Sequence, residues 1–516
     1  MGNLDDSGQA LTIVNGRRAL VTAALTALVL TTSAHVGSPD TWFEGNAGPY
    51  PVRVVVRLPG VVPGLAQIDI TVTGPGVERV TAQPVIFDAG KEGAPPPDVA
   101  KPVPGRAGGY HAQLWFMTPG SFSVNVAVAG SKGQGVAIVP VAAVPLRQIG
   151  LYPWLGRLLA ALGVFLFIGA VTIFRAAATD GVTAPGESVP AGRQRAGVVV
   201  SLFGAGLLIT ALWGGRAWWR SVERNYQNEL YRPFAAKATL DSAPGQRTLL
   251  FTITDSVWSA RRGTNRWERF SVSPLVPDHG KLMHLFLIRR GDRTAFAHLH
   301  PVSVDSLTFR AGLGGLPRGG YDVYADVVHE TGFPQTMVAS IDLPDPVPGD
   351  STRPTDPDDA VFEGAPSGDR VTLPDGATVS WEQRPATILA DQDAGLVFVV
   401  REPDGSVARL EPYLGMAAHA VVQRSDGQVY VHLHPNGTIS MVAQEALGSH
   451  RATDTIPGML ARRLAADSGM SRMAHPAFDG RLSFPYAFPK PGDYRVWVQF
   501  RHGDRIVTAP FEVAVK

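Results

Sequence analysis

The sequence predicts a mainly β protein with three immunoglobulin-like antiparallel β-sandwich domains and a two-helix transmembrane hairpin. Short runs rich in Val, Ile, Phe and Tyr recur along most of the 516 residues, and turns containing many of the 56 Gly and 42 Pro separate them. Two predominantly apolar runs of about 20 residues or more each have the length needed to cross a bilayer. The last two β-rich regions repeat one histidine pattern, which indicates a duplicated domain.

Composition excludes several classes of function. The formal net charge is only +1, from 46 basic and 45 acidic residues, so we expect no nucleic-acid partner. The chain has no Cys, which excludes disulfides, thiolate metal sites and cysteine nucleophiles. No nucleophile elbow, phosphate loop, dinucleotide fingerprint or HExxH motif is present, so the sequence does not indicate an enzyme. Any metal ligands must be His, Met or carboxylate.

The first 34 residues resemble an export signal. Two arginines precede a short apolar stretch that ends in small residues, which is typical of a signal peptide, although an uncleaved signal anchor has the same pattern. Cleavage after residue 34 would make His35 the mature terminus. Its amine and imidazole would then be able to chelate copper together with His111, in a histidine brace. Alternatively, His111 is an ordinary strand residue.

The apolar runs set the expected topology. We predict transmembrane helices over 148–174 and 196–215, a cytoplasmic loop over 175–195 and a stalk over 216–235. An exported start places residues 35–147 outside the membrane, and the chain after the second span returns to that side. The expected location is therefore the cell membrane, with the β domains on its extracytoplasmic (periplasmic or outer) side.

The expected β domains are separated by the hairpin and by one linker. Residues 35–147 form the first sandwich, 236–344 the second and 361–516 the third. Residues 345–360 are rich in Pro and Asp and indicate a linker.

The second and third regions repeat a pattern of four histidines. Each contains an upstream His, an HLHP run, and a final His that follows a Tyr by eight residues. These positions account for eight of the 13 histidines, and they are His284, His298, His300 and His329, then His419, His432, His434 and His502.

Strand geometry predicts that these histidines gather on one face. If Asp426-Gly427 is a hairpin turn, His419 lies opposite His434, and His432 shares their face because side chains alternate along a strand. Cross-strand neighbours are about 5 Å apart, which is close enough for three imidazoles to bind one ion. The alternative is that these histidines pack or form hydrogen bonds without a metal.

Other residues bear on the identity of the metal. His329 and His502 are candidates for a fourth ligand from a later strand. Imidazole ligands suit copper, zinc or nickel, and the affinity order favours copper. An insertion found only in the third region adds Met470, Met473 and His475, whose thioethers would favour Cu(I) unless the methionines simply fill the core.

Several stretches resemble a known family. KLMHLFLIRRGDRTAFAHLHP, GLPRGGYDVYADVVHETGFPQT and LEPYLGMAAHAVVQRSDGQVYVHLHP resemble YtkA-like and FixH-like immunoglobulin-type modules of exported bacterial proteins. RAGGYHAQLWFMTPGSFSVNVAVAG in the first region is similar, more weakly, to the FixH or CopC end of that group. The resemblance implies copper handling and, for FixH, assembly of copper-containing oxidases. It marks the upstream His and the HLHP run of each repeat, whereas the membrane hairpin between modules departs from single-module members.

These observations lead to one expected function and two alternatives. We expect a membrane-anchored extracytoplasmic protein that binds a transition metal, copper first, for tolerance or delivery. The first alternative is a structural or protein-interaction module that holds no metal. The second is an accessory subunit that docks on a membrane oxidase or metal transporter through its hairpin.

Overall fold

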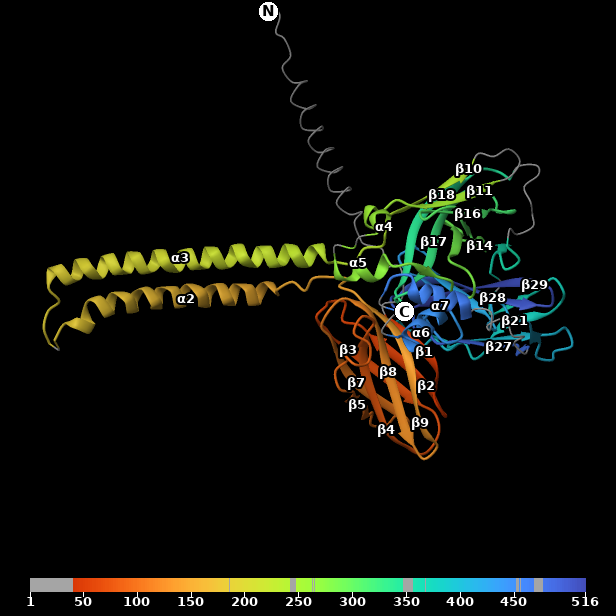
Figure 1. The fold of residues 1–516 in the computed structure, drawn as a ribbon, viewed down its shortest axis with the longest axis horizontal. Coiled ribbons are helices and arrows are strands. Elements are labelled where there is room, and N and C mark those ends of the chain that lie inside the picture. The colour runs from red at the N-terminus through yellow and green to blue at the C-terminus, as the bar shows by residue number, and fades with distance from the viewer. Residues whose placement is uncertain are drawn as a thin grey trace, which may run out of the picture.

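The computed structural model confirms a mainly β chain with several antiparallel sheets and two long apolar helices (Figure 1). It describes residues 40–516 except 185, 242–246, 262, 264, 347–355, 367, 452–453, 455 and 468–476. The expected export signal, His35 and the Met470, Met473 and His475 group lie outside the described residues.

The first β domain contains two facing antiparallel sheets, ordered β1-β2-β3-β7-β6 and β5-β4-β8-β9. Side chains alternate between buried and partly exposed along β3, as expected for a strand with one face against a core. The strands are β1 (Asp40–Ala47), β2 (Tyr50–Arg57), β3 (Gly64–Val72), β4 (Val77–Ile86), β5 (Asp98–Val99), β6 (Lys101–Pro102), β7 (Gly109–Phe116), β8 (Gly120–Gly130) and β9 (Gly133–Ala143).

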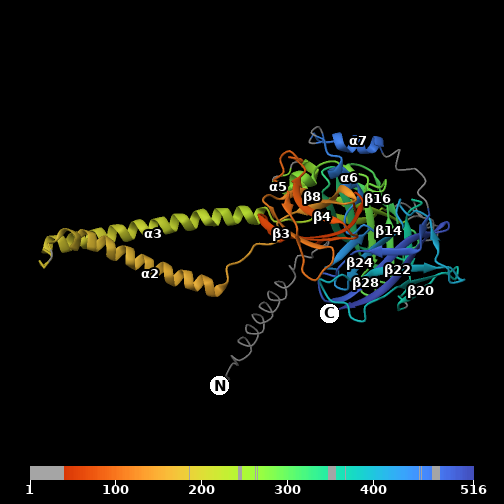
Figure 2. The same ribbon diagram turned by 90° about the horizontal axis from the view of Figure 1, so that it is seen from below.

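Two helices leave the β domains together as a hairpin, α2 (Pro153–Ala178) and α3 (Ala191–Asn228), joined by η1 (Asp180–Val182) (Figures 1 and 2). Both are long and apolar enough to cross a membrane, and their most apolar windows are 0% and 11% buried. The helices approach closely at Gly204, where a Cβ atom would lie 2.3 Å from the ring of Phe174. The second helix continues past the apolar run, so the expected stalk is largely helical.

The second β domain has a four-stranded sheet, β10-β11-β16-β15, and a six-stranded sheet ordered β12-β17-β13-β14-β19, with β18 beside β17. Its helices are α4 (Ser256–Ala260) and α5 (Arg266–Ser271). The strands are β10 (Ala236–Asp241), β11 (Thr248–Ile253), β12 (Leu275–Val276), β13 (His284–Arg289), β14 (Ala295–Leu299), β15 (Val302–Ser303), β16 (Thr308–Gly312), β17 (Gly319–His329), β18 (Pro334–Leu343) and β19 (Ala360–Glu363). Since β19 pairs with β14, the residues expected to open the third domain complete the sheet of the second.

The third β domain contains two four-stranded sheets, β20-β21-β22-β27 and β25-β24-β28-β29, and the short pair β23-β26. Its strands are β20 (Arg370–Thr372), β21 (Thr378–Trp381), β22 (Leu396–Arg401), β23 (Arg409–Leu410), β24 (His419–Arg424), β25 (Tyr430–Leu433), β26 (Phe478–Asp479), β27 (Arg481–Phe484), β28 (Gly492–His502) and β29 (Arg505–Val515). The insertion between β25 and β26 forms α6 (Met441–Gly448) and α7 (Met459–Asp467).

The insertion packs against the other two domains. Val442 and Leu460 belong to the hydrophobic core of the second domain, which also takes in Phe87 and Val144 of the first. The Gln444 amide donates to the Ile138 carbonyl at 2.9 Å. The three β domains therefore form one packed body, in which the insertion of the third domain contacts both of the others.

Candidate metal centre

The two histidine-bearing hairpins sort their side chains by face. Val421 lies opposite His432 in the β24–β25 pair, and the loop that joins these strands contains Asp426-Gly427. The residues between the histidines, such as Val431 and Leu433, point into the core of the third domain. The second domain repeats this arrangement in the β13–β14 pair, with its intervening apolar residues in the core on the opposite face. Each repeat thus presents one face that carries histidines and aromatic rings.

These two faces pack directly against each other. Tyr324 stacks on Tyr430, with ring centroids 3.9 Å apart and an interplanar angle of 3°. Phe296 stacks on Trp497 at 5.0 Å and 16°. Tyr324 and Trp497 occupy equivalent positions in the two repeats, as do Phe296 and Tyr430. The reciprocal pairs therefore relate the two domains by an approximate two-fold axis.

Seven histidines gather at this interface, and we call them the seven-histidine cluster. Its members are His279, His284, His298, His300, His419, His432 and His434. Two groups of three place one ring nitrogen from each member within 4.8 Å of the others. The first triad is His284, His298 and His300, and the second triad is His279, His419 and His434.

Each ring of the first triad has an acceptor for its outward nitrogen. His284 Nε2 lies 3.3 Å from the Asp278 carbonyl oxygen. His298 Nδ1 is 2.9 Å from Gln499 Oε1, which comes from the other repeat. His300 Nδ1 is 3.0 Å from a carboxylate oxygen of Asp359.

The inward nitrogens of the first triad then face one another. His284 Nδ1 and His298 Nε2 are 3.0 Å apart, and His300 Nε2 is buried with no partner among the described residues. Metal-binding histidines have this arrangement, with one nitrogen toward the ion and the other held by an outer acceptor.

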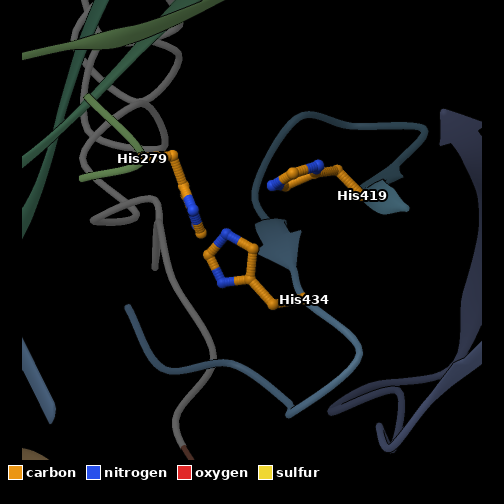
Figure 3. Close-up of side chains that lie close together, drawn as sticks. All are labelled: His279, His419 and His434. Carbon is orange, nitrogen blue, oxygen red and sulfur yellow. The ribbon is translucent and has the colours of Figure 1, made fainter. Parts of the chain in front are cut away.

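The second triad combines residues of both domains (Figure 3). His279 extends from a turn of the second domain toward the rings of His419 and His434, with centroids 5.3 and 5.2 Å away. His434 Nδ1 lies 2.8 Å from the Ile439 carbonyl oxygen, which leaves Nε2 free to face its neighbours. Both nitrogens of His419 are buried and lack a partner in the described part of the chain.

The first domain fixes the loop that orients His434. The Trp42 amide donates to Thr438 Oγ1, and the Trp42 carbonyl accepts a hydrogen bond from the Thr438 amide, each at 3.0 Å. Gly437 has φ +117°, and a Cβ atom there would lie 2.0 Å from the Trp42 carbonyl oxygen. Only glycine permits this approach, so contact with the first domain helps to position His434, a member of the second triad.

His432 lies between the two triads. Its ring centroid is 5.4 Å from those of both His284 and His419 and 4.6 Å from that of His434. Its Nδ1 is 3.6 Å from Asp326 Oδ2, and its buried Nε2 has no partner in the described structure. His432 can therefore contribute to either triad.

Electrostatics keeps these rings in their metal-binding form. Burial, reinforced by neighbouring imidazoles, holds the pKa of His284, His298, His419 and His434 well below the ordinary 6.5. Burial also lowers the pKa of His279. A neutral imidazole has a lone pair to give to a metal, whereas imidazolium does not.

The donor set fits a late first-row ion. Three or four neutral imidazoles suit copper, zinc or nickel. Tetrahedral ligands at 2.0–2.1 Å from zinc are about 3.4 Å apart. The triads, whose nitrogens lie within 4.8 Å of one another, would close on an ion through movements of about 1 Å.

The structure does not bring every predicted site residue into the cluster. His329 contacts the Ser273 carbonyl at 2.8 Å and Gln335 Oε1 at 3.4 Å, and its ring packs against Trp258. His502 lies between Asp375 and Glu402 near the surface of the third domain. The proposed fourth ligands are therefore engaged elsewhere.

His111, the expected partner of His35, lies on β7 of the first domain. Its ring nitrogens are 2.8 Å from Asp69 Oδ1 and 3.1 Å from Gln67 Oε1. This environment matches the alternative expectation of a hydrogen-bonded strand residue.

Sequence reasoning missed one member of the cluster and several residues that orient its rings. His279 has φ +54° in a turn five residues before His284, and Leu414 has φ +52° in the equivalent turn before His419. The histidine of that turn is therefore the element that differs between the repeats. Asp359 lies in the expected linker, where its carboxylate gave no signal of a role beside His300.

Comparison with known proteins adds little to this description. Residues 370–516 match a family described only as a domain of unknown function (DUF8832), and no curated protein matches the chain.

Solved structures give only remote likenesses. A tetra-tandem repeat of a large adhesion protein is 11% identical and covers 88% of this chain and 71% of its own, with TM-score 0.14. A hypothetical protein from Parabacteroides merdae is 8% identical, with 92% and 99% covered and TM-score 0.21. Scores this low carry no functional argument, which must come from the chain's own residues.

Proposed function

We propose that the protein is a membrane-anchored, extracytoplasmic metal-binding protein that holds copper, or alternatively zinc or nickel, in the seven-histidine cluster. The two triads suit about two ions per chain, one in each. Binding there would serve metal tolerance or delivery.

The observation that carries this proposal is the concentration of unpaired ring nitrogens. Six buried nitrogens on five cluster histidines have no hydrogen-bond partner among the described residues. Each such group costs about 1–3 kcal/mol relative to a paired one. A cluster assembled only for packing would not retain this cost, whereas a metal ion satisfies several nitrogens at once.

Anchoring by the hairpin follows from the exposed apolar surface of α2 and α3, which only lipid would cover well. Export of the β domains depends on the signal expected in the first 34 residues. A cell-surface protease assay on intact cells tests this orientation, since the β domains but not the loop over 175–195 should be accessible.

The YtkA-like and FixH-like immunoglobulin-type assignment belongs to the same proposal. Tyr321 donates to the Pro317 carbonyl at 2.8 Å, and Tyr494 donates to the Lys490 carbonyl at 2.7 Å. A tyrosine that bonds back to the backbone a few residues upstream is a mark of immunoglobulin-type sandwiches. The equivalent tyrosines support this fold for both repeats.

The test is metal content and titration of the full-length chain in detergent with Cu(II), Cu(I) and Zn(II). The full chain is required because α6 packs against the first domain and α7 against the second. We expect about two ions per chain, and loss of both in the double variant His300→Ala/His434→Ala. The matched control is His329→Gln/His502→Ala, which removes the two repeat histidines that lie outside the cluster and should keep both ions.

A folded chain that binds no metal would contradict the proposal and favour a structural or protein-interaction module. Loss of binding in the control as well would show that the result reflects misfolding. Co-purification with an oxidase or transporter would add the accessory role to metal binding.

A further inference from the structure

A cavity of ≈ 500 Å³ lies where the three β domains meet the end of α3. Its lining includes Leu58 and Ala142 from the first domain, Leu230 from the segment after α3, and residues of both histidine repeats. It is therefore enclosed by parts of the chain that are distant in sequence but meet at the base of the hairpin.

The cavity connects solvent with the cluster. Gln227 and Arg232 line it and are exposed, so one end opens at the surface beside α3. His284, His432 and His434 also line it, and His284 and His434 are buried. His284 belongs to the first triad and His434 to the second, and His432 lies between them.

The charges along the cavity favour a cation, because three carboxylates line it against two basic side chains, Arg232 at the exposed mouth and Lys281. Asp326 lines it and accepts hydrogen bonds from Tyr430 at 3.2 Å and Thr336 at 2.5 Å, and no lysine or arginine pairs with it in the described structure. Lys281 also lines the cavity, but its ammonium is paired with Asp356 at 2.5 Å and Asp358 at 3.1 Å. An uncompensated carboxylate thus lies beside His432 on the wall.

The mouth lies on the side from which the helices emerge. The part of α3 after the apolar run, residues 216–228, extends for about 20 Å at 1.5 Å per residue. The mouth is beside the end of this segment, at Gln227 and Leu230, which places it at the membrane-proximal side of the β domains.

We propose that this cavity is the path by which metal ions enter and leave the seven-histidine cluster, so that they are exchanged at the membrane-proximal side of the protein. This inference rests on the proposed metal-binding function. His432, which lines the path and lies next to both triads, is the ligand that passes the ion to either one.

The absence of native cysteine allows a direct test. In the full-length chain, Leu230→Cys places a thiol at the mouth, and a bulky, disulfide-linked label is attached after folding. Ala127→Cys on β8 of the first domain, partly exposed and outside the cavity lining, receives the same label as the matched control. Ala142→Trp gives a second obstruction without a label.

The measurements are the rate of Zn(II) uptake by stopped flow, the rate of Zn(II) transfer to a chelator, and the zinc content at equilibrium. We expect the label at position 230 to slow uptake and release at least tenfold with unchanged equilibrium content, and reduction of the disulfide to restore both rates. The label at position 127 should change neither rate.

Uptake and release at the unlabelled rate in both obstructed variants would overturn the entry path while leaving metal binding intact. Equal slowing by the label at position 127 would also overturn it. Failure of the unmodified chain to bind zinc or copper at equilibrium would instead contradict the proposed function itself.

Discussion

Replacement of His279 by leucine should raise the free energy of unfolding of the metal-free protein. It should also reduce the stabilisation that the protein gains when metal is added. His279 Nε2 is buried without a partner among the described residues, and its nearest carboxylate oxygen, Asp278 Oδ1, is 3.8 Å away. Leu414 occupies the equivalent turn at φ +52°, so leucine tolerates this backbone. Removal of one unpaired buried polar group while keeping apolar bulk should add about 1–3 kcal/mol to the metal-free free energy of unfolding.

The stabilisation gained on binding metal should fall in the same variant. A ligand at 100 times its Kd stabilises the folded state by about 2.7 kcal/mol per site. The native chain should therefore gain about 5 kcal/mol from two ions. His279→Leu removes one of three imidazoles from the second triad only, so the gain should fall to about 2.7 kcal/mol from the first triad.

The assay is thermal unfolding of the full-length variant in detergent, with chelator or with excess Zn(II). The melting temperature of the metal-free variant should rise by roughly 2–4 °C per kcal/mol, and its shift on adding zinc should be about half that of the native chain. His111→Leu, on the first domain, is the control and should leave the zinc shift unchanged. A metal-free variant that is less stable, with an unchanged zinc shift, would refute the reasoning and make His279 a packing residue.

Three further predictions follow from individual contacts. Gln499→Leu removes the nearer of the two partners of His298 Nδ1, the other being the Tyr413 hydroxyl at 3.2 Å, and should weaken zinc binding to one site by about 10-fold in titration calorimetry. Burial lowers the pKa of His329 from 6.5 to about 4. The neutral ring therefore contributes about 3 kcal/mol to stability above pH 6.5, and this contribution is lost as the pH falls from 6.5 to 4. His329→Gln should flatten the pH dependence of metal-free urea unfolding by that amount, and an unchanged pH dependence would contradict the assignment. Trp497→Ala, which removes a stacked ring but no ligand, should cost about 3–5 kcal/mol in urea unfolding and also weaken zinc binding.

Much of the fold follows from local patterns in the sequence. Short runs of β-branched and aromatic residues between turns predicted the β-rich regions, and long apolar runs predicted the two helices. Alternation along a strand placed His432 and His434 on the face opposite Val431 and Leu433. These inferences hold because each concerns neighbours in one strand or hairpin, where backbone geometry decides which side chains share a face.

The shared cluster was beyond such reasoning, because it depends on how two domains meet. The sequence predicted that the histidines of each repeat share one face of a hairpin, without indicating what lies against that face. The same face carries Phe296 and Tyr324 in one repeat and Tyr430 and Trp497 in the other, and all four rings are buried by the partner domain. Period-two alternation shows which side chains share a face, but it cannot show what covers that face.

Two further residues of the cluster and its surroundings, His279 and Asp359, lie in irregular segments, where no periodic pattern predicts the direction of a side chain. His279 lies in a turn, and Asp359 lies in a segment whose Pro and Asp content indicated a linker. Asp359 is nevertheless buried, and its carboxylate accepts from both the backbone amide and the ring of His300. The Asp content of that segment reflects these contacts as well as solvation.

The differences between the repeats make the two triads chemically unequal. In the first triad, a carboxylate, Asp359, holds the outer nitrogen of His300, whereas the equivalent nitrogen of His434 meets only the neutral Ile439 carbonyl. A carboxylate acceptor raises the basicity of a ligating imidazole more than a carbonyl does. The second triad combines His279 of the second domain with two histidines of the third, so its geometry depends on the relative position of the two domains. In the proposed metal-bound protein, we therefore expect the first triad to bind its ion more tightly and the second triad to release its ion more readily.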